Sequence, residues 1–386
     1  MREPARLQAA IEILDAVIAG AATGGAAADT IVQRYFAQRR YAGSKDRAAV
    51  RELAYAAIRF CADRPASGRA AMLGLAKARR PELLHLFDGS PHAPAAIGTD
   101  EPHVSAGLVP GWLEPAMKAR FGAHMEPEVR ALVERAPLDL RVNPMQATVA
   151  DVAEALGAEP IAGLPMGLRL EMPIPLEQHP LFLAGAFEIQ DAGSQMVAQL
   201  AAAAPGETVV DLCAGAGGKT LALAAAMQGD GRLIATDTDR ARLQAMPARL
   251  QRAGVADLVE TRLLDPRKEA SQLADIAGTV DLVLVDAPCS GTGTWRRNPE
   301  LRWRLTPQRL ERLLGVQARL IDLGASLLRP GGRLVYAVCS VLECEGSVQA
   351  KAAASRLALT PRATAALSPG SDGCDGFFIA KFERSR

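Results

Sequence analysis

Residues 1–87 carry apolar side chains at the spacing of amphipathic helices. A first helix is predicted by apolar positions three or four residues apart, at Leu7, Ile11, Leu14 and Ile18. Glycines at positions 20, 24 and 25 predict its end. A second helix is predicted over residues 45–61, with Ser44 as its N-cap and Cys61 on its buried face. We therefore expect a helical domain over residues 1–87.

The middle of the chain mixes helical and strand patterns. A loop rich in Pro, His and Gly at about residues 88–110 predicts a linker. Residues 126–136 have helical spacing, whereas residues 138–143 alternate between apolar and polar as a strand does. Thr148 is placed to cap a helix that follows it. This pattern predicts a small α+β subdomain over residues 110–178.

From residue 179 to the end, short apolar runs alternate with amphipathic stretches. Helices are expected over residues 218–227, 239–253 and 306–328. Such alternation is typical of an α/β fold, a mostly parallel Rossmann-like sheet with helices on both faces. The closing run GFFIAKF (376–382) is expected to add an antiparallel strand at the edge, which completes a catalytic domain over 179–386. The apolar runs read as strands are TVVDLC (208–213), RLIATD (232–237), LVETRLL (258–264), DLVLVDAP (281–288) and GRLVYAVC (332–339).

Composition limits the class of protein without choosing a function. The 386 residues are 49% apolar and 23% charged, as in globular proteins. No apolar run reaches the roughly 18 to 20 residues that span a bilayer. The N-terminal stretch MREPARLQAAIEILD carries acids among its apolar residues, which is unlike a secretory signal. We expect a soluble, cytoplasmic, monomeric protein with no membrane partner.

Charge and cysteine positions add two observations. The net charge is only +1, but residues 34–80 hold twelve Lys or Arg against three Asp or Glu. That excess is either a solvated helical face or a surface that contacts phosphates. The six cysteines have neither the paired spacing of a zinc site nor that of a small disulfide framework, so no metal is expected.

A glycine-rich loop follows the first predicted strand of the catalytic domain. The segment DLCAGAGGKT (211–220) would let its backbone approach a ligand at the start of the next helix. It is not a phosphate-binding Walker loop, because Cys213 stands where that motif needs its first glycine. Asp237 ends the second strand, where it could accept ribose hydroxyls, and Asp265 follows the third, near an adenine amino group. An adenosine cofactor without phosphates, S-adenosylmethionine, fits this set.

Two thiols follow the fourth and fifth predicted strands. DAPCSGTG (286–293) places Asp286 and Cys289 in one turn, and YAVCS (336–340) places Cys339 at the next strand end. Methylation of cytosine at carbon 5 needs a thiolate that adds to carbon 6, and a group that removes the carbon 5 proton. A carboxyl group at ring nitrogen 3 would stabilise the adduct. An acid and two thiols form a plausible set for this reaction.

In these motifs the chain resembles the RsmB/Nop/Sun family of RNA cytosine-5 methyltransferases. The resemblance covers about residues 110–386 and also includes IQDAGSQ (189–195), RRNPELRW (296–303) and DGFF (375–378). It implies S-adenosylmethionine as cofactor and RNA, ribosomal RNA in the bacterial members, as substrate. Residues 1–87 resemble the NusB-like RNA-binding domain of those members more weakly.

The resemblance also implies roles for individual residues. Cys339 would be the nucleophile, Cys289 would assist release of the product, and Asp286 would serve both catalysis and cofactor binding. The loop has Gly215 and Ala216 where the family usually has Ala and Pro, and Val338 replaces a usual Thr before Cys339. Losing the proline should loosen the loop slightly. The cofactor site would be lined by Cys213, Ala214, Gly215, Ala216, Gly217, Gly218, Lys219, Asp237, Asp265 and Asp286.

Two other functions share these residues. The chain could be an RNA-binding or ribosome-assembly factor with a vestigial site, or a DNA cytosine methyltransferase, in which the Pro-Cys thiol attacks. A cluster of aromatic and guanidinium groups would suit unstacked RNA, with packing as the alternative for the two tryptophans. The cluster consists of Trp295, Arg296, Arg297, Arg302 and Trp303.

Overall fold

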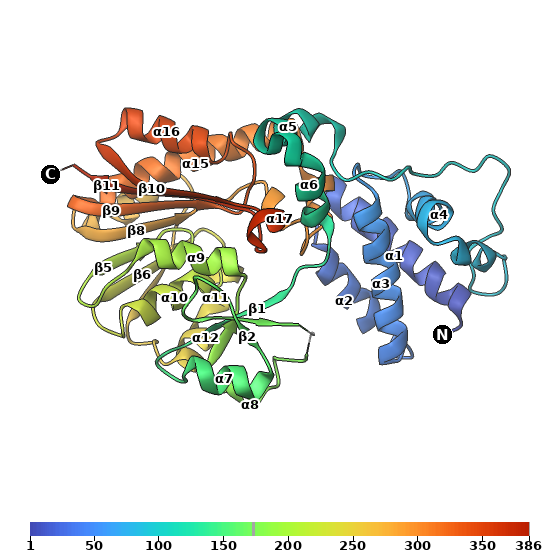
Figure 1. The fold of residues 1–386 in the computed structure, drawn as a ribbon, viewed down its shortest axis with the longest axis horizontal. Helices are drawn as coiled ribbons and strands as arrows, with labels where there is room; N and C mark the ends of the chain where they lie inside the picture. The colour runs from blue at the N-terminus through green and yellow to red at the C-terminus, as the bar shows by residue number, and fades with distance from the viewer. Residues whose placement is uncertain (172–173, 386) are drawn as a thin grey trace. The chain divides into compact units, whose positions relative to one another are not determined.

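The computed structural model describes residues 1–171 and 174–385 (Figure 1). The chain forms two compact units. One contains Met1–Arg135 together with Thr294–Pro307, and the other contains Ala136–Gly293 together with Gln308–Arg386. The domain limits expected near residues 87, 110 and 178 stay a prediction. Among the described helices, none is long and apolar enough to cross a membrane.

The first unit is helical, as its amphipathic spacing predicts. Its core is built from buried Leu, Ile, Val, Ala and Phe side chains of the N-terminal helices. One expectation is wrong: Ser44 is the first residue of its helix, and Gly43 occupies the N-cap without any side-chain bond. The prediction that Cys61 belongs to the core is confirmed, since the residue is fully buried. The helices are α1 (Glu3–Thr23), α2 (Ala28–Ala37), α3 (Ser44–Phe60), α4 (Gly68–Arg79), α5 (Glu114–Phe121), α6 (Met125–Val133) and α14 (Leu301–Arg304).

The segment Thr294–Pro307 is part of this helical core, although it lies far along the chain. Trp303 packs in the core cluster, and its indole N–H donates to the carbonyl oxygen of Cys61 over 3.1 Å. Arg302 donates to the carbonyl oxygens of Ile58 at 2.7 Å and Leu108 at 2.9 Å. Trp295 is also fully buried. The hypothesis of an RNA-stacking surface is therefore wrong for these three residues and for Arg296, which is also buried, and the alternative of packing is confirmed for the two tryptophans.

The second unit contains a small antiparallel sheet in the order β2-β3-β1-β4. Thr148 caps α7 as expected, since its side chain accepts from the N–H of Asp151. Leu140, Val142 and Phe187 are fully buried in the cluster beneath this sheet. The elements are β1 (Leu138–Val142), α7 (Val149–Leu156), β2 (Glu159–Pro160), β3 (Gly167–Leu170), α8 (Pro180–Leu183) and β4 (Phe187–Ile189).

The larger sheet has seven strands in the order β10-β11-β9-β8-β5-β6-β7. The five strands from β9 to β7 are parallel, and β11 joins β9 antiparallel. The closing strand is thus antiparallel as expected, but β10 lies outside it at the edge. The strands are β5 (Thr208–Asp211), β6 (Arg232–Asp237), β7 (Val259–Leu263), β8 (Val280–Asp286), β9 (Leu328–Val338), β10 (Leu359–Leu367) and β11 (Phe377–Arg384).

Helices cover both faces of this sheet, which explains why its strands are apolar on both sides. One face packs against α9, α10 and α12, with Val197, Leu223 and Leu250 among the buried contacts. The other packs against α15 and α16 (Figure 1). The helices of this unit are α9 (Ala192–Ala201), α10 (Gly218–Ala226), α11 (Arg240–Gln244), α12 (Met246–Ala253), α13 (Glu269–Gln272), α15 (Pro307–Leu327), α16 (Ser347–Arg356) and α17 (Pro369–Asp372).

Candidate active site

The predicted site residues follow parallel strands that end at one edge of the large sheet. The strand order reverses between β5 and β8, because the chain proceeds from β5 to β6 and β7 on one side and to β8 and β9 on the other. Open α/β sheets bind ligands at this point, outside the carboxyl ends of the strands. The glycine loop follows β5, and the two thiols follow β8 and β9.

The glycine loop makes a tight, open turn between β5 and α10. Gly215 has a φ of +57°, a conformation that side chains disfavour, and no atom lies within 4 Å of where its Cβ would be. Its N–H donates to Asp237 Oδ2 over 2.8 Å, and the N–H of Ala214 donates to the carbonyl oxygen of Thr236 over 2.9 Å. The end of β6 therefore fixes the loop and leaves open space above Gly215.

Two arginines hold the carbonyl groups of this loop. Arg249 donates to the oxygen of Ala216 over 2.7 Å and forms an ion pair with Glu188. The buried Arg141, from the small antiparallel sheet, donates to the oxygen of Gly218 over 2.9 Å. These bonds restrain the loop from outside.

The acids at the strand ends differ in their surroundings. Asp237 is half-buried, and besides Gly215 its carboxylate accepts from the N–H of Asp239 over 2.7 Å. Asp265 is exposed, and its contact with Lys268 spans 3.9 Å. Asp237 is thus part of a fixed loop, whereas Asp265 lies at the open rim.

Lys219 and Asp286 form an ion pair below the loop, with 2.7 Å between Nζ and Oδ2. Burial alone would lower the pKa of Lys219, but the charges of Asp286, Cys339 and Asp211 raise it above its ordinary value. Lys219 therefore remains a cation near Cys339. Among the described residues, no group of three or more His, Cys, Asp or Glu is arranged to hold a metal ion.

The thiols of Cys289 and Cys339 are in direct contact. Their Sγ atoms lie 3.3 Å apart, and both residues are partly exposed. The hydrogen bond to Cys339, followed by burial, raises the pKa of Cys289 well above its ordinary value. Either thiol can donate in this contact, and the contact is itself the first cause of the raised pKa of Cys289. Cys213 is also partly exposed, and burial followed by nearby carboxylates raises its pKa.

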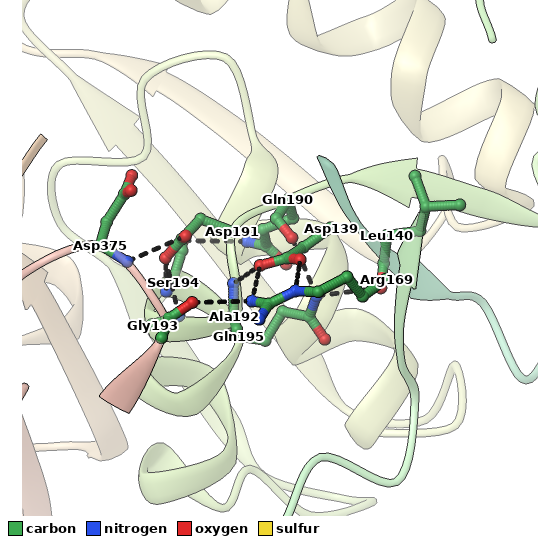
Figure 2. A network of polar contacts seen from close by, with 11 residues as sticks. Asp139, Leu140, Arg169, Gln190, Asp191, Ala192, Gly193, Ser194, Gln195 and Asp375 are labelled. Atoms are coloured by element: carbon green, nitrogen blue, oxygen red, sulfur yellow. Dashed lines mark hydrogen bonds and ion pairs between the residues drawn. The ribbon is translucent and has the colours of Figure 1, made fainter. Parts of the chain in front are cut away.

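A polar network joins strand β1 to the start of α9 and to Asp375 (Figure 2). Asp139 forms a two-bond ion pair with Arg169 and accepts from the N–H of Ala192 over 3.1 Å. Asp191 Oδ1 accepts from the N–H of Asp375 over 3.0 Å, which ties IQDAGSQ to DGFF. Strand β1 and the start of α9 are thus joined to the segment that precedes β11.

The network continues through two glycines into the turns that carry the thiols. The N–H of Gly376 donates to Gly293, and the N–H of Gly293 donates to the carbonyl oxygen of Cys339 over 3.1 Å. A Cβ on Gly293 would lie 1.9 Å from the oxygen of Gly376, so only glycine fits there. The motifs IQDAGSQ, DGFF, DAPCSGTG and YAVCS therefore form one connected structure.

The sequence alone did not single out three residues of this site. Arg141 and Arg249 donate to carbonyl oxygens of the glycine loop, and no local sequence pattern predicts these contacts. Asp211, the first residue of the glycine motif, is fully buried, and burial raises its pKa to about 7. Its place at the end of a strand and the start of the motif was a visible signal.

The seven-stranded order and the glycine loop after the first parallel strand define the fold of S-adenosylmethionine-dependent methyltransferases. Residues 198–383 match the family described as 16S rRNA methyltransferase RsmB/F, and residues 109–177 match an RsmF/B-like ferredoxin-like domain. The chain belongs to this RsmB/F methyltransferase family, whose cofactor is S-adenosylmethionine. The open space over Gly215 and the acid at the end of β6 fit that cofactor.

Individual relatives agree with this family. The chain is 37% identical over 250 residues to the probable ribosomal RNA small subunit methyltransferase B of Synechocystis, covering 62% of this chain and 55% of the relative. It is 36% identical over 293 residues to ribosomal RNA small subunit methyltransferase B of Salmonella arizonae, covering 71% of this chain and 66% of that protein. The chain thus spans less than two thirds of these relatives. The crystal structure of PH0851 shares the fold, with a TM-score of 0.77 and 23% identity over 100% of this chain and 99% of that one.

Proposed function

We propose that this protein methylates carbon 5 of a cytosine in small-subunit ribosomal RNA, through a covalent bond between Cys339 and carbon 6. The contact of two thiols at 3.3 Å, at the ends of adjacent parallel strands, carries the proposal. A structural role for two packed cysteines would not need both to be partly exposed beside the Lys219–Asp286 pair.

In this mechanism Cys339 attacks as a thiolate, helped by its surroundings. The thiol of Cys289, 3.3 Å away, would donate a hydrogen bond to the Cys339 thiolate, and Lys219 contributes a nearby positive charge. Attack forms the bond from sulfur to carbon 6 and makes carbon 5 an enamine nucleophile. Asp286 would hold Lys219 close to the ring, where the charge of Lys219 offsets the negative charge that develops towards ring nitrogen 3. When bound, S-adenosylmethionine supplies the electrophilic methyl group that carbon 5 accepts.

Release of the product needs a base, and the same thiol pair supplies it. Once Cys339 is a thioether, it no longer holds a charge or the hydrogen bond that raised the pKa of Cys289. The pKa of Cys289 then falls, its thiol proton passes to water, and the Cys289 thiolate removes the proton from carbon 5. The electrons of that C–H bond re-form the ring double bond and expel the Cys339 thiolate.

The substrate follows from the family and from the requirements of the chemistry. The relatives are named as methyltransferases of small-subunit ribosomal RNA. A cytosine must leave its stack to reach a thiol, so a loop or single-stranded site is expected. Exposed basic side chains of the helical unit, such as Arg34, Arg40 and Lys45, are available to phosphates.

The test compares three cysteine variants on small-subunit ribosomal RNA with labelled cofactor. We expect Cys339→Ala to lose methylation by at least a thousand-fold, and Cys289→Ala to accumulate an RNA–protein adduct because elimination stalls. Cys344→Ala, in the same segment and also partly exposed, is the control and should retain turnover. Normal turnover by Cys339→Ala would refute the assignment. An adduct in Cys339→Ala but not in Cys289→Ala would instead indicate that Cys289 attacks.

The identity of the base needs a separate measurement. Bisulfite sequencing of small-subunit ribosomal RNA after incubation should reveal one protected cytosine in an unpaired region. Matched DNA and large-subunit RNA should stay unmodified. Modification of the DNA instead would overturn the choice of RNA as substrate.

A further inference from the structure

A buried carboxylate, that of Glu345, lies between the two turns that carry the thiols. Glu345 follows β9 by a few residues and is fully buried. Its Oε1 accepts from the N–H of Ser290 over 2.8 Å and from Gln317 Nε2 over 2.9 Å. Its Oε2 accepts from Ser340 Oγ over 2.5 Å and from Ser290 Oγ. All four donors are neutral, and both oxygens are fully used.

The two serines directly follow the two reactive cysteines. Ser290 follows Cys289, and its N–H belongs to the peptide that joins them, so Glu345 fixes the orientation of that peptide. Ser340 follows Cys339 in the same way. Oε1 therefore binds only the turn that carries Cys289, whereas Oε2 binds the turns of both cysteines.

Further bonds make the two turns a single rigid unit. The hydroxyls of Thr292 and Ser340 lie 2.9 Å apart, and Thr292 Oγ1 accepts from the N–H of Val341 over 3.1 Å. Gln317, from α15, also donates to the carbonyl oxygen of Pro288 over 3.0 Å, on the other side of Cys289. The turn after β8 is thus restrained before and after its thiol.

Burying a carboxylate is costly, so its presence here calls for a reason. An apolar residue would fill the space at lower cost, and an amide would place N–H groups against hydroxyls and N–H groups that already donate. A carboxylate alone accepts four hydrogen bonds at once and strengthens each with its charge. The length of the glutamate side chain lets both turns share it.

We propose that Glu345 is a positioning residue, which holds Cys289 and Cys339 in contact through Ser290 and Ser340. It does not touch the reacting atoms, and its effect on the reaction passes through the thiols. The importance of this contact for catalysis rests on the proposed cytosine chemistry, whereas the contact itself is open to direct measurement.

The informative variant is Glu345→Asp, which keeps the charge and withdraws it by one methylene group. The control is Glu343→Asp, the same change at an exposed position two residues earlier. The first readout is the pH dependence of Cys289 alkylation by iodoacetamide, followed by peptide mass spectrometry. The contact with Cys339 is the first cause of the raised pKa of Cys289, so loosening it should move the alkylation midpoint to lower pH.

The second readout is turnover. Glu345→Asp should lower kcat at least ten-fold and change KM for RNA less than two-fold, whereas Glu343→Asp should match the wild type. An alkylation midpoint that stays with the wild type would overturn the proposal. If Glu345→Asp does not fold, Ser340→Ala is used instead. It removes the hydroxyl that donates to Glu345 and leaves the charge of Glu345 unchanged, and the same two readouts apply. Alkylation requires no RNA, so a wild type without methyltransferase activity would refute the proposed function and leave the positioning test intact.

Discussion

Single residues in this site act through charge states that burial and close partners set. Cys289 stays protonated beside Cys339, and Lys219 stays charged beside Asp286. Asp211 is the third case, because burial raises its pKa to about 7, although the hydroxyl of Thr220, which donates over 2.7 Å, and the charge of Lys219 favour the ionised form. The ionised form of Asp211 therefore destabilises the folded state at neutral pH.

This unfavourable ionisation of Asp211 predicts a specific pH dependence of stability. The folded state binds the Asp211 proton more tightly than the unfolded state, in which the carboxyl has its ordinary pKa of 3.8. The free energy of unfolding should therefore fall as pH rises from about 4 to about 7, and level off above. Asp211→Asn removes this loss and keeps the contact with Thr220, so it should stabilise the protein at pH 8 by about 2–4 kcal/mol.

The measurement is urea unfolding of the wild type and Asp211→Asn at several pH values. The free energy of unfolding of Asp211→Asn minus that of the wild type should grow from about pH 4 to about pH 7 and then stay constant. Asp257→Asn, an exposed position, serves as the control and should leave the difference near zero. Parallel curves for Asp211→Asn and the wild type would show that this carboxyl titrates normally.

At the scale of elements, the glycine loop depends on parts of the unit that are distant in sequence. Strand β6 holds it through Asp237, helix α12 through Arg249, and the small sheet through Arg141. Each bond fixes one peptide group of the turn. The loop is therefore shaped before a ligand arrives, which lowers the entropic cost of binding.

Removing one of these bonds should weaken cofactor binding more than it weakens the fold. Arg249→Ala frees the carbonyl group of Ala216, while Glu188 keeps its ion pair with Arg252. We expect the dissociation constant of S-adenosylmethionine to rise by about ten-fold, equivalent to about 1.4 kcal/mol. Isothermal titration calorimetry measures it, with Arg242→Ala as control, because that side chain is 70% exposed on α11. Equal affinity of both variants for S-adenosylmethionine would show that the bond from Arg249 does not contribute to cofactor binding.

The strands and motifs were predictable because they depend on local pattern. The apolar runs at β6 and β8 are bounded by polar turns, and the sequence predicts both strands within one or two residues. The edge strand β10 was missed, because LTPRATAAL carries a proline and exposed alternate positions that resemble a loop. Burial of Trp295, Arg302 and Trp303 was equally hidden, since it depends on a core built from residues far away in the chain.

The sequence predicts that Cys289 and Cys339 follow two strands of one mostly parallel sheet, whereas the adjacency of those strands comes from the structure. Their contact, and the place of Glu345 between their turns, also come from the structure. Two glutamates stand in YAVCSVLECEG, Glu343 and Glu345, and both resemble surface residues in the sequence; only the packed turns reveal that Glu345 is buried. Local pattern locates chemistry along a strand, whereas three-dimensional packing determines which polar groups support it.

At the scale of the whole molecule, each of the two compact units is built from two separate segments of the chain. The helical unit includes Thr294–Pro307, so the chain passes between the units after residues 135, 293 and 307. Arg302 is buried in the helical unit with a pKa of about 10, lowered mainly by burial, and it still carries its charge at neutral pH. Backbone carbonyl oxygens from α3 and from the loop at Leu108 surround that charge.

Arg302 should therefore be a main contributor to the stability of the helical unit. Arg302→Met would leave the carbonyl groups of Ile58 and Leu108 without this donor, at a cost of about 3 kcal/mol. Native-state hydrogen exchange should report a loss of protection of about a hundred-fold in α1 and α3. Arg64→Met, exposed in the same unit, should leave exchange unchanged. Equal protection in both variants would mean that Arg302 contributes little.

The discontinuous helical unit has a consequence for biosynthesis. Helices α1 to α4 leave the ribosome long before Trp303, which completes their core. Domains usually fold in the order of translation. Here the N-terminal helices must wait, with an apolar cavity where Trp303 will pack, until residues up to Pro307 have been made. A nascent chain of this length with an unfinished core is a natural client for chaperones, and ribosome-stalled chains ending before residue 294 should bind them more strongly than chains that extend well past residue 307.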